Sequence, residues 1–197
     1  MRELIDGHHA GAWLIVLAFL TGCATKHDAG NPDEKQAEIS AAETASVKEE
    51  VLYKNEIAHE FASPNEMDSF RIQLTGQSIA EGEITFEIRS QARGIIYQES
   101  FPAVYLLGYG YAGETDEEAA NYIRGRIDDF LDTAQFSKPA ISEMDSFEEE
   151  YSEKAIWEDI ASDSTAIGFY YHVGEENGRH IAYSKKRKKV VVYFSCC

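Results

Sequence analysis

The chain is poor in positive charge. Its 18 lysines and arginines are outnumbered by 35 aspartates and glutamates, and the formal net charge at pH 7 is −17. Nucleic-acid binding depends on cation clusters that replace the counterions of the phosphates. The excess of carboxylates therefore argues against nucleic acid as a partner and favours a soluble, self-repelling surface.

A hydrophobic run long enough to cross a membrane is missing from the N-terminal region. The uncharged apolar stretch Ala10–Leu20 is shorter than the roughly 20 residues of a membrane-spanning helix. Its length is typical of the apolar segment of a secretory signal peptide. It leads directly into Leu20-Thr21-Gly22-Cys23.

These four residues resemble the lipobox of bacterial lipoproteins, which consists of an aliphatic residue, two small residues and an acceptor cysteine. The resemblance implies that residues 1–22 are a signal peptide, that Cys23 receives a diacylglyceryl group on its sulfur, and that its new amino group is acylated. Several acyl chains make release from a membrane slow. The implied protein is anchored by lipid in the bacterial cell envelope, and Ala24, as a residue other than Asp, favours the outer membrane. An uncleaved anchor or a buried helix is the alternative.

Residues 23–50 have few large apolar side chains. Ala24–Glu50 contains no aromatic residue, and only Ile39 and Val47 are larger aliphatics. Such a segment buries too little surface to offset the entropy lost on ordering. We therefore expect a flexible tether at 23–50 and one folded domain at 51–197.

Within that domain, apolar and polar residues alternate from Phe70 onwards. A period of two predicts half-buried strands around residues 70–75 and 83–89, and a third strand is expected at Gly94–Phe101. Three more are expected near the C-terminus, at Ile167–Val173, Arg179–Ser184 and Val190–Phe194.

Two helices are expected between these groups of strands. Thr115-Asp116-Glu117-Glu118 matches a capping box, and apolar residues continue at helical spacing to Ala134. A second helix is predicted at Ser142–Ala161. The order βββααβββ predicts an α+β domain with one antiparallel sheet of about six strands and both helices packed on one face.

The dipeptide Asn177-Gly178 favours a type I′ hairpin, whose two central residues need positive φ. The resulting register pairs His172 with Tyr183 and His180 with Glu175. His172 and His180 then point to opposite faces of the sheet. No metal site is expected on this hairpin, and no cofactor is expected in the chain.

A G-x-G-x-x-G pattern at Gly108, Gly110 and Gly113 raises the question of a dinucleotide site. That fingerprint needs a second parallel strand after the helix, and here more helix is expected. The carboxylates from Glu114 to Glu118 also oppose a pyrophosphate at the helix start. We expect no dinucleotide binding.

Tyr105, Tyr109 and Tyr111 surround the same glycines. Tyrosine combines apolar area with a hydroxyl at low entropic cost, so one interpretation is a contact surface for an envelope protein or a glycan. Tyrosines beside a sheet edge are more often ordinary core or rim residues, and this is the interpretation that the sequence favours.

The one dense basic run is Lys185, Lys186, Arg187, Lys188 and Lys189. Three interpretations are open: a solvated hairpin tip, which we favour, an intramolecular partner for the acidic helix, or a contact site for anionic lipid or polysaccharide.

The remaining residues give little indication of a catalytic or metal-binding site. Cys196 and Cys197 allow a disulfide or soft-metal binding, but two free thiols are the expectation. No G-x-S-x-G, H-E-x-x-H or P-loop motif occurs. The favoured function is a non-catalytic binding module of the envelope. The alternative is an envelope hydrolase that uses a carboxylate pair within Glu143–Asp163.

Overall fold

The first four strands form an antiparallel sheet in sequence order. A computed structural model describes residues 50–196, and within them β1 (Val51–Glu60), β2 (Met67–Thr75), β3 (Glu83–Ser90) and β4 (Gly94–Pro102) pair as β1-β2-β3-β4. The register sets Phe70 opposite Ile88 and Ile72 opposite Phe86. The alternating apolar residues therefore gather on one inner face of this first sheet.

The last four strands form a second antiparallel sheet. Its order is β5-β6-β7-β8, with β5 at Phe136–Ser137, β6 at Gly168–His172, β7 at Gly178–Ser184 and β8 at Lys189–Cys196. Because β5 has only two residues, it pairs only with Gly168 and Phe169 of β6. Beyond Phe169, no strand among residues 50–196 pairs with this edge of β6.

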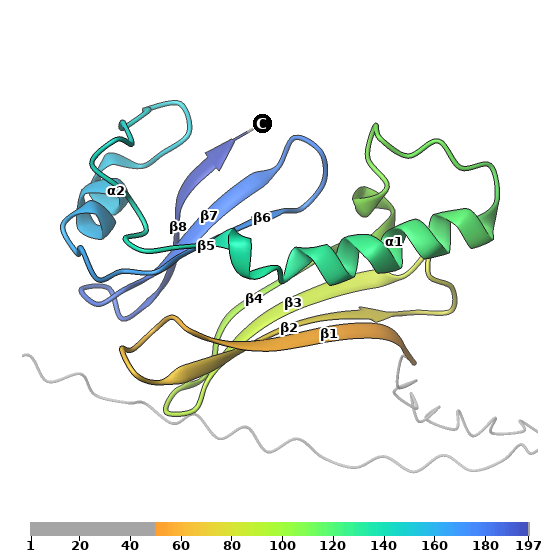
Figure 1. Cartoon of the computed structure of the whole chain (residues 1–197), viewed down its shortest axis with the longest axis horizontal. Coiled ribbons are helices and arrows are strands. Elements are labelled where there is room, and N and C mark those ends of the chain that lie inside the picture. Colours follow the sequence, from red (N-terminus) through yellow and green to blue (C-terminus); the bar gives the residue numbers. More distant parts are fainter. Residues whose placement is uncertain (1–49, 197) are drawn as a thin grey trace, which may run out of the picture. The chain divides into compact units, whose positions relative to one another are not determined.

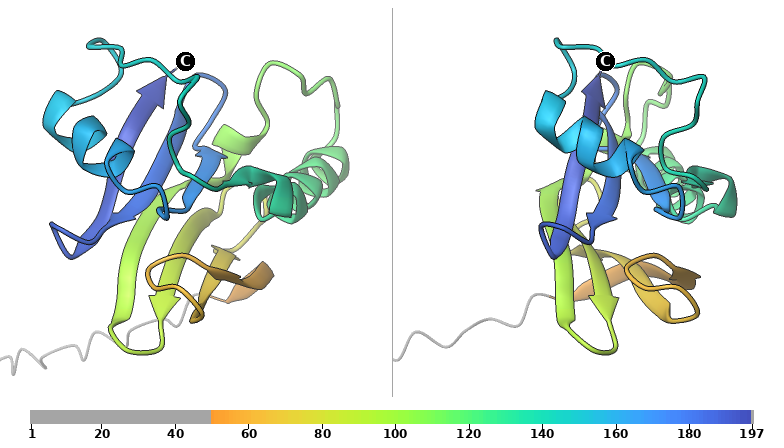
Figure 2. Two further views of the ribbon diagram at one scale, coloured as in Figure 1. Left: turned by 60° about the vertical axis from the view of Figure 1, so that its left-hand side comes forward. Right: turned by 90° about the vertical axis from the view of Figure 1, so that its left-hand side faces the viewer.

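The two α-helices lie on different sheets. The 15-residue helix α1 (Asp116–Phe130) runs along the first sheet, and α2 (Lys154–Ala161) lies beside β7 and β8 (Figures 1 and 2). Short 3₁₀ turns, η1 (Ala103–Leu106) and η2 (Thr133–Gln135), flank α1. No helix within residues 50–196 has the length and apolarity to cross a membrane.

One aromatic core joins the first sheet, α1 and the second sheet. Phe169 of β6 lies 5.2 Å from Phe70 and 5.6 Å from Phe86, measured between ring centroids. Phe130, the last residue of α1, lies 5.1 Å from Phe86 and 5.3 Å from Tyr171. The opposite face of the second sheet has a smaller core of its own, which includes Ile160 of α2.

The prediction of a single sheet with both helices on one face is wrong. All six predicted strand segments are strands, but β1 and β5 bring the total among residues 50–196 to eight, in two sheets of four. The apolar inner face of the second sheet packs against the apolar inner face of the first. Both faces are therefore buried, although the strands do not form one continuous sheet.

Strand β1 escaped the sequence analysis because its inward positions are partly polar. Tyr53, Asn55, Ile57 and His59 stand opposite the inward residues of β2. The Tyr53 hydroxyl donates to the Asp128 carboxylate at 3.1 Å, and the Asn55 amide donates to the Asp128 carbonyl at 3.2 Å. These polar side chains attach β1 to α1. Because they occupy inward positions, the sequence of β1 does not show the alternation of apolar and polar residues that predicts a strand.

The predicted second helix is also shorter than expected. It covers only Lys154–Ala161 of the predicted Ser142–Ala161. At the predicted start, the Asp145 carboxylate accepts from the Ser142 amide at 2.7 Å and from its hydroxyl at 2.8 Å. Side chains of this kind compete with helical hydrogen bonds. The acidic segment 143–150 is thus a loop, whereas the capping box at Thr115 and Glu118 is confirmed.

A half-buried polar network links the two sheets beside the aromatic core. The Tyr171 hydroxyl donates to the Glu99 carboxylate at 2.6 Å, and Arg179 forms an ion pair with the other Glu99 oxygen at 3.0 Å. The Tyr97 hydroxyl also donates to Glu99, at 3.2 Å. Burial raises the pKa of Tyr97 to about 12 and raises the pKa of Tyr171 further. Both phenols are therefore neutral at neutral pH.

These raised pKa values predict that the fold loses stability in alkali. Folding favours the protonated phenols, so their contribution is complete below the unfolded pKa of about 10 and falls as the pH rises towards 12 and beyond. The free energy of unfolding should decline with a shallower slope in Tyr97→Phe than in the wild type. Denaturant titrations at several pH values, with the absorbance of tyrosinate as the probe, measure this. Identical slopes in the two proteins would contradict the assignment.

Candidate functional site

The glycine loop, residues 107–115, joins η1 to α1 and lies against the turn between β6 and β7. Gly108 has a φ of 59°, and a side chain there would meet the Glu175 carboxylate at 3.0 Å. The Gly110 amide donates to that carboxylate at 3.2 Å. A side chain at Gly113 would clash with the Tyr111 ring. The glycines therefore allow close packing of the loop.

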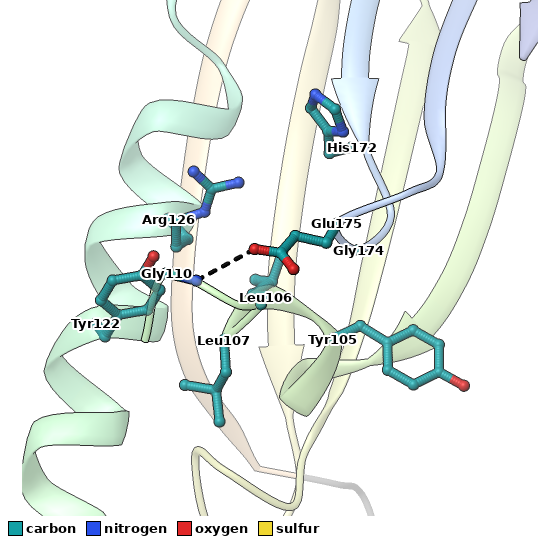
Figure 3. A pocket seen from close by; sticks show the side chains of 10 residues that line it. Tyr105, Leu106, Leu107, Gly110, Tyr122, Arg126, His172, Gly174 and Glu175 are labelled. Atoms are coloured by element: carbon teal, nitrogen blue, oxygen red, sulfur yellow. Dashed lines mark hydrogen bonds between the residues drawn. The ribbon is translucent and has the colours of Figure 1, made fainter. Parts of the chain in front are cut away.

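A cavity of about 230 Å³, here called the socket, lies between this loop, α1 and the β6–β7 turn (Figure 3). Its polar side chains come from separate elements: Tyr122 and Arg126 from α1, His172 from the end of β6, and Glu175 from the turn. Leu106 and Leu107 supply apolar wall. The socket therefore combines a cation, a carboxylate and an imidazole.

Arg126 is an uncompensated charge in the socket. It forms no hydrogen bond or ion pair with any other of the residues 50–196, although the chain has an excess of carboxylates. Burial of the imidazole lowers the pKa of His172, and the charge of Arg126 lowers it further. His172 is therefore neutral at pH 7, and the guanidinium is free to take an acceptor from a ligand.

His172 is held in place by Tyr170, whose hydroxyl lies in hydrogen-bonding contact with Nε2 of the imidazole. The Tyr170 ring also lies 4.5 Å from the ring of His180. The three side chains share one face of the second sheet, because Tyr170 pairs with His180 and His172 pairs with Gly178.

The predicted hairpin register is therefore wrong. His172 and His180 lie on the same face, not on opposite faces, since residues 173–177 form a five-residue loop in which Gly174 carries the positive φ of 127°. Neither Asn177 nor Gly178 has positive φ. Even so, within residues 50–196 no three His, Cys, Asp or Glu side chains gather in an arrangement that could hold a metal ion.

The socket continues into a second cavity of about 160 Å³ along the open edge of β6. The two cavities share Leu106, Arg126 and His172. Asp129 and Gln135 line the far end. Because β5 stops at Ser137, α1 and η2 rather than a strand face this edge, and a groove remains between helix and sheet.

Tyr105 lines the socket, and Tyr109 lies beside it. They are 51% and 82% exposed, and with Val104 they line a shallow open cleft of about 490 Å³ against residues 173–177. Tyr111 differs: its ring packs 5.3 Å from Tyr122, and its hydroxyl donates to the Thr115 carbonyl at 3.3 Å. Two of the three predicted tyrosines therefore share one surface.

The start of α1 offers little to a dinucleotide phosphate. The Glu118 carboxylate already accepts from the amides of Glu114 and Thr115, at 3.0 Å each. Every strand pair in the two sheets is antiparallel, so the parallel unit that the fingerprint requires does not form here.

The first four residues of the basic run form the turn between β7 and β8, and Lys189 begins β8. Two of the five cations are neutralised by α2 and the residues after it. Lys185 forms an ion pair with Asp163 at 2.8 Å, and Arg187 forms one with Asp159 at 3.5 Å. Lys186, Lys188 and Lys189 have no ion pair with any of the residues 50–196. The run is thus part intramolecular partner and part exposed tip.

Two of the carboxylates in the segment proposed for a hydrolase, Asp159 and Asp163, are engaged in the same contacts. Burial raises the pKa of Asp163, but hydrogen bonds from Lys185 and Thr165 outweigh it, and the pKa lies below its ordinary value. A general acid needs a raised pKa. The geometry therefore gives these carboxylates a structural role. At the end of β8, Cys196 is disulfide-bonded, so the expectation of a free thiol is wrong for this residue.

The sequence analysis missed Arg126, His172 and Glu175 as a group. They are separated in the chain, and only the packing of α1 against β6 brings them together. The one signal of this site in the sequence is the glycine pattern, because glycines often mark a position where another segment comes close. In the structure, Gly108 has a positive φ, and the Glu175 carboxylate approaches it.

No known family model matches the chain, and the searches of curated proteins and of solved structures find no significant match either. Arguments about function therefore depend on the site alone.

The glycine loop gives a test with an internal control. Gly108→Ala places a side chain at positive φ and displaces Glu175, and it should lower the free energy of unfolding by about 1–2 kcal/mol. Gly125→Ala, in the middle of α1 with open space around it, should raise the free energy by about 0.5–1 kcal/mol. Denaturant unfolding of both variants measures the difference. Equal effects would mean that Gly108 is not needed for its conformation.

Proposed function

We propose that the chain is a lipid-anchored protein of the bacterial outer membrane and that its folded part is a non-catalytic module that binds another envelope protein. The anchor is inferred from Leu20 to Cys23, which lie outside the described residues. The binding role is inferred from the tyrosine surface, defined as Val104, Tyr105, Tyr109 and the adjoining residues 173–177.

The observation that carries the binding proposal is the exposure of large apolar side chains around a charged socket. Val104, Tyr105 and Tyr109 are 48%, 51% and 82% exposed. Isolated exposed apolar residues are ordinary, but a cluster of them beside unpaired polar groups is typical of interaction sites. Tyrosine and arginine are also the residues that dominate binding energy at protein interfaces.

The open shape of the tyrosine surface supports a protein partner over a small ligand. Small-molecule sites enclose most of the ligand, whereas Tyr105 and Tyr109 line a shallow open cleft. An open cleft with one small charged hollow suits a protein surface that inserts a single polar side chain. Arg126 and Glu175 are then the groups that orient the inserted side chain.

Photo-crosslinking from the full chain in the native envelope tests the binding role. A photoreactive residue at Tyr109 should yield one crosslinked protein, whereas the same residue at Met144, which is 95% exposed but lines none of these cavities, should not. Arg126→Gln should reduce the yield from position 109 several-fold. Equal crosslinking from both positions, or capture of polysaccharide alone, would overturn the proposal.

The anchor has its own test. Replacing Cys23 by Ala removes the only sulfur in the lipobox-like segment, so labelling with a fatty-acid analogue should disappear and an unprocessed precursor should accumulate in the membrane. Gel analysis of labelled cells shows both effects. Normal labelling of the variant would remove the basis for the lipid anchor.

A further inference from the structure

Three chain turns meet at a cleft away from the tyrosine surface. The cleft has a volume of about 500 Å³ and is lined by Ala62, Ser63 and Pro64 from the β1–β2 turn, Arg93 from the β3–β4 turn, and Tyr183, Lys185 and Lys188 from β7 and the β7–β8 turn. Every charged side chain that lines it is a cation. In a chain with a net charge of −17, this cation cleft is unusual.

The cations differ in how far they are neutralised. Lys185 is paired with Asp163 at 2.8 Å. Arg93 and Lys188 have no carboxylate partner among residues 50–196. Two full positive charges therefore remain without a counter-charge at this position.

Arg93 is fixed in the cleft by neutral groups. Both terminal nitrogens donate to the Ser63 hydroxyl, at 3.2 and 3.3 Å, and the guanidinium lies 5.1 Å above the centre of the Tyr183 ring. These contacts orient the guanidinium without neutralising it. Because Ser63 accepts from Arg93, its own hydroxyl hydrogen is free to donate.

Lys188 is held in an unfavourable backbone conformation. Its φ is 55°, and the only other non-glycine residue with positive φ among residues 50–196 is Asn65, which directly follows Pro64 of the same cleft. Asparagine tolerates this conformation, but lysine is strained in it. A lysine where glycine would fit better suggests that the side chain has a use of its own.

We propose that the cation cleft binds a phosphate group, with Arg93 and Lys188 as its two charged ligands and the Ser63 hydroxyl as a neutral donor. The cleft offers charged donors and no carboxylate, so the ligand must be an acceptor-rich anion. Arginine presents a planar fork of donors that matches phosphate oxygens, and lysine adds a point charge. The site is separate from the tyrosine surface and does not depend on the role proposed for it.

The full chain in neutral detergent tests the site, with inorganic pyrophosphate as the probe and calorimetry as the readout. Arg93→Gln and Lys188→Gln should each weaken binding about tenfold, because each removes one charge-assisted contact. Lys186→Gln is the matched control. It removes the same charge from the same turn, but Lys186 lines a different cavity, so binding should change less than about twofold apart from a general salt effect.

Lys188→Gly separates binding from folding. Glycine adopts the positive φ without strain, so the variant should unfold at a denaturant concentration close to that of the wild type and still lose binding about tenfold. If the wild type binds neither pyrophosphate nor the anionic micelles described below, or if Lys186→Gln and Lys188→Gln weaken binding equally, the proposal is overturned.

A second arm identifies the source of the phosphate. The same variants are titrated with detergent micelles that contain phosphatidylglycerol, and with micelles that contain only a zwitterionic phospholipid. Binding to the anionic micelles that depends on Lys188 identifies a lipid headgroup. Binding of pyrophosphate alone, with the same dependence on Lys188, identifies a soluble phosphate compound. Either result supports the phosphate site.

Discussion

The fold depends on one layer of aromatic rings between its two sheets. Phe70 and Phe86 of the first sheet meet Phe169 of the second at 5.2 and 5.6 Å, and Phe130 closes the same layer from α1. Fully buried aromatic rings contribute large apolar areas and additional ring–ring attraction. Because α1 and β6 are both fixed by this layer, Arg126, one helical turn before Phe130, comes to lie beside His172 at the end of β6. The socket is thus a consequence of the core.

The sequence predicted correctly those elements whose patterns arise from residues close together in the chain. The alternation through Phe70, Ile72 and Leu74 gave a correct strand because all three side chains are fully buried on one face. Thr115 and Glu118 gave a correct helix start because a capping box is completed within four residues. Strand β1 was missed since Tyr53 and Asn55 use their inward positions to hold Asp128. Polar residues with distant partners leave no periodic signal in their own segment.

The arrangement of the strands into two sheets could not be predicted from such local patterns. Whether six or eight strands make one sheet or two depends on which apolar faces meet, and the contact between Phe70 and Phe169 joins residues that are far apart in the chain. The register of β6 and β7 depended on the turn between them. Asn177-Gly178 is a strong local signal, but the longer loop places the left-handed residue at Gly174. A change of register by an odd number reverses the faces, and His172 and His180 therefore lie together.

The cations of this acidic chain fall into two groups, those that form ion pairs within the fold and those that do not. Lys185 and Arg187 are neutralised by Asp163 and Asp159, and these pairs fasten the β7–β8 turn to α2 and the residues that follow it. Exposed pairs of this kind stabilise a fold only slightly. Carboxylates are nearly twice as numerous as basic side chains, so an unpaired cation does not result from a shortage of partners. Arg126 in the socket and Arg93 and Lys188 in the cation cleft are left uncompensated by residues 50–196, and neighbouring charges repel less when an external anion joins them. Their charges are therefore available to acceptor groups that enter these two hollows.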